Sequence, residues 1–354
     1  MHNTYYALLH NYALLTPKIK KLTNYLLTKI ILLIIMKKIL LMAVAVVIGG
    51  QFLAAQDTKS GILSNVTQLT NDDVKYENPR WSPDGEKIAF TEFGYDGLYT
   101  MNANGSSKKH LLTSSGVGYM FQWSADSKEI LVRDTRWLET SDGAMRAHAA
   151  WAVNTTNGTT FRMSQDAEYM QPAAWRYTGG VKTIVAPEVA VMKANLTPLN
   201  KTMAKTLAGN KYINTSFICD FEHLYIVDEL GNKRVLNVGP SFCPALSPDG
   251  KKVVFNEMDD ICVINVDGTG KQKIGRGFNP SWVNNSQIIF EKTEDDGHEY
   301  TAGELYIMNA DGKNVKALTA TPNLIEMNPC ISPDGNKIVF TSFTNGQIYV
   351  ADLK

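Results

Sequence analysis

The 354-residue sequence has little of what most enzyme and metal sites require. No Cys-x-x-Cys pair occurs, which argues against a zinc ribbon or a thioredoxin-like redox site. No Gly-x-Ser-x-Gly segment occurs either, so the nucleophile elbow of an α/β-hydrolase is missing. The histidines beyond residue 55 are widely spaced, and we expect each to be solvated or hydrogen-bonded rather than a metal ligand: His110, His148, His223 and His298. The sequence therefore predicts no catalytic residue, no metal and no cofactor.

Cysteine is scarce, and the four cysteines do not suggest a disulfide framework. All of them lie in expected strands among apolar neighbours, where a free cysteine acts as a small hydrophobic residue: Cys219, Cys243, Cys262 and Cys330. Cys243 and Cys262 are expected on the first and third strands of one sheet, too far apart to form a disulfide.

Acidic residues are absent from residues 1–55, which contain six lysines. Met36-Lys37-Lys38, an apolar run over residues 39–48 and Ala54-Ala55 have the layout of a secretory signal peptide. Neither this run nor the shorter apolar run over residues 30–35 reaches the roughly 20 residues that a spanning helix needs. We expect residues 1–35 to be an extension upstream of a misassigned start and residues 36–55 to be a signal peptide cleaved near Ala55. An uncleaved membrane anchor is the alternative.

The charge balance changes once residues 1–55 are set aside. The whole chain has 35 basic and 35 acidic residues, and without the six lysines 29 basic residues remain against 35 acidic ones. A net charge of −6 argues against a nucleic-acid partner bound by a basic patch, and gives no electrostatic reason for membrane association. We expect residues 56–354 to form one exported domain.

A repeated segment organises this domain. Strong copies cover residues 78–90, 242–255 and 328–340, each with Ser-Pro-Asp-Gly at its centre, and weaker copies begin at residues 121, 173 and 279. Each predicts a strand, a tight turn and a second strand, because Pro fixes the first turn position and Asp-Gly tolerates positive φ. The turn aspartates Asp84, Asp249 and Asp334 are thus expected to be structural.

A second hairpin follows most copies of the repeat. It ends in Asn-Gly or Asp-Gly, as in residues 98–105, 261–268 and 305–312. Two hairpins make a four-stranded antiparallel sheet, and sheets of this kind bury their faces by stacking radially as a β-propeller. The tryptophans at one repeat position are expected to pack between neighbouring sheets: Trp81, Trp123, Trp175 and Trp282.

With its Ser-Pro-Asp-Gly repeats, the sequence resembles the TolB-like (PD40, WD40-like repeat) β-propeller family over most of residues 66–354. The resemblance implies an all-β propeller in the periplasm or cell envelope that works as a protein-binding module or scaffold. It implies partners among envelope proteins, such as peptidoglycan-associated lipoproteins. The alternative is a propeller hydrolase or lyase acting on a glycan or peptide in the central funnel.

Strand spacing predicts six or seven blades, with seven favoured. The uncertain region lies between Trp175 and Phe242, which has no Ser-Pro-Asp-Gly copy; it holds either two blades with one strand short or one blade with a long insertion. Residues 202–207 are expected to be a strand there. The chain stops after a third strand, so residues 66–70 are expected to complete the last blade and close the ring.

Function in a propeller is expected where the repeat is broken. Residues 136–146 and 294–301 are two such breaks, both expected as loops that join a second to a third strand on one face. The first offers a tryptophan flanked by arginines, a composition enriched at binding hot spots, and the second a block of acids. Either could instead be plain structure: Trp137 packed on its own blade, or a solvated charged loop. The candidate partner-binding residues are Arg136, Trp137, Arg146, Glu294, Asp295, Asp296, His298 and Glu299.

Overall fold

The computed structural model describes residues 62–353 except 142, 187–188, 209–214, 220–221, 229, 231 and 322–323. These residues belong to one unit, Lys59–Lys354. The expectations about residues 1–35, the signal peptide at 36–55 and its cleavage near Ala55 concern residues outside the described ones. Among the described residues, no helix is both long and apolar enough to cross a membrane.

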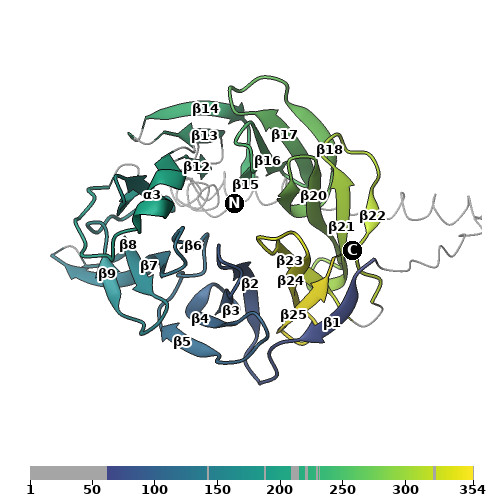
Figure 1. Cartoon of the computed structure of the whole chain (residues 1–354), viewed down its shortest axis with the longest axis horizontal. Coiled ribbons are helices and arrows are strands. Elements are labelled where there is room, and N and C mark those ends of the chain that lie inside the picture. The colour runs from purple at the N-terminus through teal and green to yellow at the C-terminus, as the bar shows by residue number, and fades with distance from the viewer. Residues whose placement is uncertain are drawn as a thin grey trace, which may run out of the picture. The chain divides into compact units, whose positions relative to one another are not determined.

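Seven antiparallel sheets form the described part, and they follow one another around a ring (Figure 1). The first contains β2 (Tyr76–Trp81), β3 (Lys87–Glu92), β4 (Asp96–Asn102) and β5 (Lys109–Leu112). The second contains β6 (Gln122–Trp123), β7 (Glu129–Thr140), β8 (Gly143–Asn154) and β9 (Thr160–Arg162). A two-stranded sheet follows, with β10 (Ala174–Thr178) and β11 (Val181–Val185), and then the helix α3 (Lys201–Ala208).

The remaining sheets complete the ring. A three-stranded sheet contains β12 (Ser216–Cys219), β13 (His223–Val227) and β14 (Lys233–Val238). Next come β15 (Ser241–Leu246), β16 (Lys252–Glu257), β17 (Asp260–Asn265) and β18 (Gln272–Arg276). They are followed by β19 (Phe278–Asn284), β20 (Gln287–Asp295), β21 (Tyr300–Asn309) and β22 (Lys316–Ala317). The closing sheet contains β23 (Glu326–Ile331), β24 (Lys337–Ser342), β25 (Gln347–Asp352) and β1 (Ser64–Gln68).

The prediction of an all-β propeller of four-stranded antiparallel sheets is confirmed. Six of the described sheets have three or four strands, which agrees with a propeller of six blades. The β10–β11 hairpin is a further sheet with only two described strands. The region between Trp175 and Phe242 thus contributes five described strands, where two full blades would need eight. Among the described strands, the three-stranded sheet has no inner strand and the hairpin has no outer pair.

The strand expected at residues 202–207 is wrong, because these residues lie in α3. Asn200 caps this helix: its Oδ1 accepts a hydrogen bond from Met203 N at 2.8 Å, as a helix N-cap does. The segment that follows is rich in Lys, Met, Ala and Leu, which all favour helix.

The ring closes through the N-terminal strand, as the sequence predicts. β1 pairs with β25 in antiparallel register, with Thr67 opposite Val350. The next residues continue the ladder: Leu69 N donates to Ile348 O at 2.7 Å, and Ile348 N donates to Thr70 Oγ1 at 2.9 Å. The two ends of the described chain therefore share one sheet, which leaves no open edge on β25.

The Ser-Pro-Asp-Gly turns are structural, as expected. In the first copy, Ser82 Oγ donates to Asp84 Oδ1 at 2.5 Å and accepts from Lys87 N at 2.9 Å, while Gly85 has φ 74°. The same serine–aspartate bond recurs in the turns at Ser247 and Ser332. These bonds satisfy the backbone of each tight turn locally.

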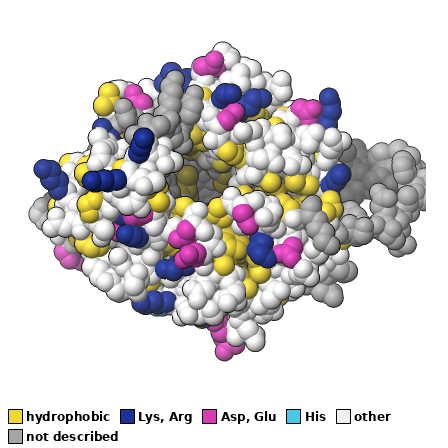
Figure 2. Space-filling model, in the orientation of Figure 1, with side chains coloured by type: hydrophobic (Ala, Val, Ile, Leu, Met, Phe, Trp, Pro, Cys, Tyr) yellow, Lys and Arg dark blue, Asp and Glu magenta, His cyan; other side chains and the backbone are white. Residues whose placement is uncertain are grey.

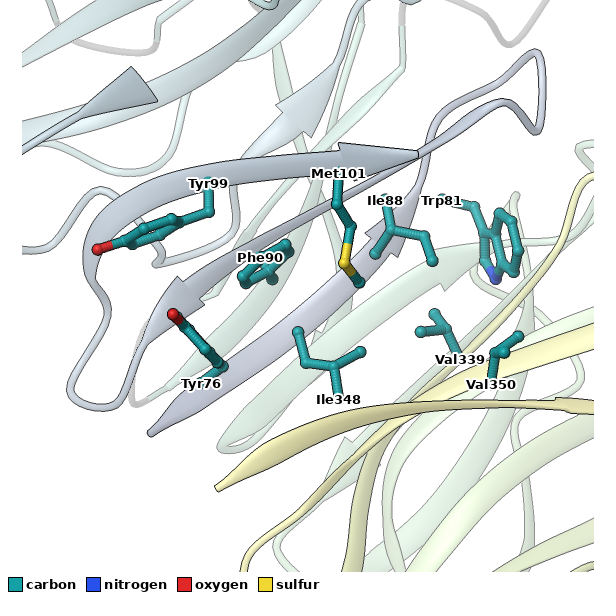
Figure 3. Close-up of a cluster of buried hydrophobic side chains, with 9 residues drawn as sticks. All are labelled: Tyr76, Trp81, Ile88, Phe90, Tyr99, Met101, Val339, Ile348 and Val350. Carbon is teal, nitrogen blue, oxygen red and sulfur yellow. The ribbon is translucent and has the colours of Figure 1, made fainter. Parts of the chain in front are cut away.

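The hydrophobic core lies between successive sheets. Figure 3 shows one such cluster, in which Tyr76, Trp81 and Phe90 of the first sheet face Ile348 and other residues of the closing sheet. The repeat tryptophans are part of these layers: Trp81, Trp175 and Trp282 are buried and Trp123 is half-buried, which confirms their core role.

A buried ion cluster attaches the β10–β11 hairpin to the sheet before it. Lys182 on β11 lies 2.8 Å from the carboxylate of Asp126 and also pairs with Glu129, both in the turn before β7 or at its start. The side chain of Lys182 is fully buried. Removing one partner of such a cluster leaves a buried charge uncompensated.

Candidate binding cavity

Four of the inner strands carry the same bulge. Each has a residue with positive φ just before a proline: Asn78 (53°), Cys243 (50°), Asn279 (49°) and Asn328 (54°). The register of each inner strand against its neighbour shifts at that point. A bulge bends the strand and redirects a side chain. Here Cys243, Asn279 and Asn328 line a cavity enclosed by the ring.

This cavity has a volume of about 1050 Å³. Its wall comes from the bulged inner strands and from the hairpins that join second to third strands, such as Phe93–Tyr95 and Met258–Asp259. Figure 2 shows a hollow at the centre of the ring with hydrophobic side chains beside it. A volume of this size is enough for a drug-sized molecule or a few residues of peptide.

Glu291 on β20 is the buried acid of the cavity, with 2% of its surface exposed. Its carboxylate accepts a hydrogen bond from Asn279 Nδ2 at 2.8 Å and another from Asn328 N at 2.5 Å. Burial raises the pKa of Glu291 to about 7, against the opposing effects of these hydrogen bonds and of the Arg80 charge. The carboxyl group is therefore positioned by two neighbouring sheets and changes charge near neutral pH.

Cys243 corrects an expectation from the sequence. It is exposed to the cavity rather than packed as a small hydrophobic residue, and its Sγ donates to Asn279 Oδ1 at 3.2 Å. Desolvation raises the pKa of the thiol, which keeps it protonated and weakly nucleophilic. Cys262 is buried as expected, and none of the four cysteines forms a disulfide in the described part of the chain.

Aromatic side chains surround the mouth of the cavity. Phe343 lies between Phe93 and Tyr300, with ring centroids at 6.1 and 5.2 Å respectively. Phe93 is 60% exposed, and Met258, across the mouth, is 62% exposed. Large apolar side chains that remain exposed together, around a hollow, mark an interaction surface more often than isolated ones do.

The segment at residues 136–146 is not the loop that the sequence suggests. It extends β7 and β8 into a long regular hairpin, in which Trp137 is paired opposite Arg146. Trp137 is 71% exposed, so the interpretation that it packs on its own blade is wrong. Arg136 is held by Asp166, with Nη2 at 2.7 Å from Oδ1.

The acidic segment also lies largely in strands. Glu294 and Asp295 end β20, and Asp296, His298 and Glu299 form the turn before β21. Asp296 Oδ1 accepts hydrogen bonds from His298 N and Glu299 N, which fixes the turn and lowers the pKa of Asp296. Asp295 lines the cavity. The β7–β8 and β20–β21 hairpins stand on opposite sides of the ring (Figure 1), so the structure does not bring the two candidate groups together.

Sequence reasoning missed Glu291, although a signal for it exists. Four second strands have the same pattern, in which a buried Phe is followed by a polar residue. That residue is Thr91, Asn256 and Thr341 in three of them and Glu291 in the fourth. All four are nearly fully buried. An acid in a repeat position otherwise held by neutral side chains is a break in chemistry rather than in length.

The described residues contain no group of three or more His, Cys, Asp or Glu side chains able to hold a metal ion. His110 stacks on Tyr99 with centroids 4.3 Å apart, and His148 Nδ1 lies 2.9 Å from Thr135 Oγ1. Burial lowers the pKa of His148. These two histidines are held by local contacts, as the sequence predicts.

The ring of antiparallel sheets around a central cavity defines the class of the protein as a β-propeller. No family model matches the chain. It is 28% identical over 126 residues to the protein TolB homolog of Chlorobium luteolum, a match of 32% of this chain and 27% of that protein. It is 35% identical over 66 residues to the Tol-Pal system protein TolB of Wolbachia pipientis subsp. Culex pipiens, covering 19% and 16%.

These matches confirm the resemblance drawn from the repeats, and the chain is a TolB-like β-propeller. The match spans less than a third of the length of each of these relatives. In three dimensions the chain is similar to a chain of the mitotic checkpoint complex, with a TM-score of 0.52 and 12% identity over 83% of this chain and 96% of that one. That likeness concerns the fold alone.

Proposed function

We propose that the chain is an exported, TolB-like β-propeller that binds a protein of the cell envelope on the face where the central cavity opens. The observation that carries this proposal is the cluster of exposed apolar side chains at the mouth. Phe93, Tyr95, Met258 and Tyr300 are each more than a third exposed, and they come from three different sheets. A rigid ring that presents large apolar residues around a hollow suits a protein surface better than solvent.

Export and an envelope location rest on two supports. One is the signal-peptide layout of residues 36–55. The other is the similarity to TolB proteins, one of which is described as part of the Tol-Pal system. N-terminal sequencing of the purified protein tests the export: the chain is expected to begin near Gln56. An intact Met1 or Met36 would favour a membrane anchor instead.

The long β7–β8 hairpin offers a second contact for the same partner. Trp137 is its exposed aromatic residue, and Arg146 opposite it is an exposed cation. Arg136 is less suited to direct binding, because its guanidinium group already pairs with Asp166. On the other side of the ring, Glu294, Asp296, His298 and Glu299 surround the end of the β20–β21 hairpin with exposed polar groups.

The proposal is tested by measuring how rim variants of the full chain bind a partner purified from envelope extract. The double variant Phe93→Ser, Met258→Ser is expected to weaken binding by about tenfold or more, as loss of central apolar contacts does. Trp137→Ala is expected to weaken it less. The matched control is Val235→Ser, Val238→Ser, since both valines are exposed on β14 and neither lines the cavity. Equal affinity of the mouth variant and the control variant would show that the partner binds elsewhere on the chain.

A further inference from the structure

The charged residues that line the cavity are mostly acidic. Four carboxylates contribute to its wall, Glu77, Asp259, Glu291 and Asp295, against a single base, Lys75. Two of these acids have raised pKa values because they are desolvated: Glu77 and, more strongly, Glu291. A concave wall with an excess of one sign raises the local concentration of the opposite charge. The cavity therefore favours a cationic group over a neutral or anionic one.

The place of Glu291 in its sheet does not require a charged side chain. At the equivalent place on β16, the neutral Asn256 closes the wall by donating its Nδ2 to Gly277 O at 2.7 Å. Thr91 and Thr341 hold the same place on β3 and β24. Since three sheets are built with neutral residues here, the acid on β20 is not needed for packing. Burying it has a cost, which its raised pKa expresses.

The aromatic residues of the cavity suit the same kind of ligand. Phe242, Phe278 and Tyr300 line the wall, and each is more than a third exposed. The face of an aromatic ring attracts an ammonium or guanidinium group, most strongly where water is excluded. Acid and aromatic side chains thus converge on one cavity from the β15, β19, β20 and β21 strands.

We propose that the cavity receives a cationic side chain, the ammonium of a lysine or the guanidinium of an arginine, with Glu291 as its counter-ion. This inference rests on the proposed function, since it names the group that the protein partner inserts into the mouth. Asn279 and Asn328 orient the carboxylate of Glu291 from the inner strands of two successive sheets, and each oxygen retains a lone pair for the incoming cation.

Other charges near Glu291 shape its response to pH. Arg80 on β2 stabilises the carboxylate through its charge, whereas Cys243 on β15 and Tyr300 on β21 are neutral in the range where Glu291 titrates. The groups on β19 and β23 that contact it are uncharged amides. A cation that binds next to Glu291 favours the ionised form. Binding is therefore expected to weaken as the pH falls below about 7 and Glu291 gains a proton.

The test compares two peptides that differ only in charge, acetyl-Gly-Arg-Gly-amide and acetyl-Gly-citrulline-Gly-amide, by titration calorimetry on the full chain. At about pH 8 the arginine peptide is expected to bind about tenfold more tightly, and the difference should shrink at about pH 6. Glu291→Gln should abolish the difference, while Asp311→Asn, an acid in an exposed turn outside the cavity, should leave it unchanged. Discrimination that persists in Glu291→Gln, or its absence in the native protein, would overturn the inference.

Two further measurements keep the test decisive. If Glu291→Gln does not fold, the pH profile of the native protein still tests the inference, since the citrulline peptide has no charge to pair with the Glu291 carboxylate and should show no transition near pH 7. The partner itself separates the two proposals. A partner that depends on Phe93 and Met258 but binds Glu291→Gln normally contradicts the cation site and leaves the proposed function standing. Selective binding of the arginine peptide by a chain that binds no protein partner would support the cation site and contradict the proposed function.

Discussion

The backbone N–H of Ile348 donates a hydrogen bond to Thr70 Oγ1 at 2.9 Å, across 278 positions of sequence. This bond joins β25 to the segment that comes after β1, and so helps to hold the first and last strands in one sheet. Thr70 is 3% exposed, so this bond is shielded from water. The threonine hydroxyl just beyond the end of β1 thus adds to the backbone ladder that closes the ring.

Replacing Thr70 by valine tests this closure. The change keeps the shape but removes the acceptor, which leaves a buried N–H without a partner and should cost about 1–3 kcal/mol in the free energy of unfolding. Thr67→Val is the control, because Thr67 is exposed and its hydroxyl bonds only to the nearby Asn65. Chemical unfolding of both variants is the measurement. Equal stabilities would show that the ring closes without this bond.

The repeat tryptophans provide a matched pair. Trp282 Nε1 donates to Ala245 O, 3.0 Å away in the preceding sheet, whereas Trp81 Nε1 has no hydrogen-bond partner among the described residues. Both rings are buried to a similar extent. Trp282→Phe should therefore be more destabilising than Trp81→Phe by about 1 kcal/mol, the net worth of one hydrogen bond. Equal losses in thermal melts would mean that only the volume of the rings matters.

The buried cluster around Lys182 should be sensitive to loss of its cation. Lys182→Met leaves Asp126 and Glu129 buried without their counter-ion, and is expected to destabilise the chain by about 3–5 kcal/mol. The pair between the exposed Lys273 and the half-buried Asp260 is the control, since Lys273→Met should cost less than about 1 kcal/mol. Urea unfolding distinguishes the two. A small loss in Lys182→Met would show that water or another cation replaces the ammonium group.

Glu291 should also make stability depend on pH. Its pKa is about 7 in the folded chain against an ordinary value of 4.5, so the folded state holds more protons between these values. The free energy of unfolding should therefore fall as the pH rises through this window, by on the order of 1–3 kcal/mol from Glu291. Glu326 on β23, buried and with a pKa also raised to about 7, acts in the same direction.

Urea midpoints measured from about pH 5 to pH 8 test this dependence. Glu291→Gln should flatten the decline because it removes the titrating group, and Glu299→Gln, in an exposed turn, should not. A native protein whose stability rises steadily over the same range would contradict the burial of an ionisable Glu291.

Repeats made most of the fold predictable. Pro and Asp-Gly fix the turn geometry whatever lies around them, which is why the Ser82 and Ser332 turns and their flanking strands follow directly from sequence. The strand expected at residues 202–207 was wrong because no turn signal fixes a strand register there. The Asn200 cap and the helix-favouring residues that follow it form α3 instead. Local helix signals of this kind are easily overlooked where a sequence repeat predicts a strand.

The cavity was less predictable than the fold. Asn279 and Asn328 lie far apart in sequence and meet only because bulges in successive inner strands turn toward the centre. Their Asn-Pro pairs are visible in the sequence, but the direction in which the side chains point is set by the closed ring. The extra length of residues 136–146 drew attention to Trp137. An acid at position 291, where three other sheets have a neutral residue, changes no segment length and so gave no such signal.

The most direct test of the central claim, a protein-binding surface at the mouth of the cavity, is photo-crosslinking in the native envelope. A photoreactive phenylalanine analogue is placed at Met258, on the mouth, and separately at Val238, which is 72% exposed on β14 and outside the cavity. The account predicts one discrete crosslinked protein from position 258, lost when Phe93 is changed to Ser, and none from position 238. Equal crosslinking at both positions, or a product at 258 that is indifferent to Phe93→Ser, would contradict it.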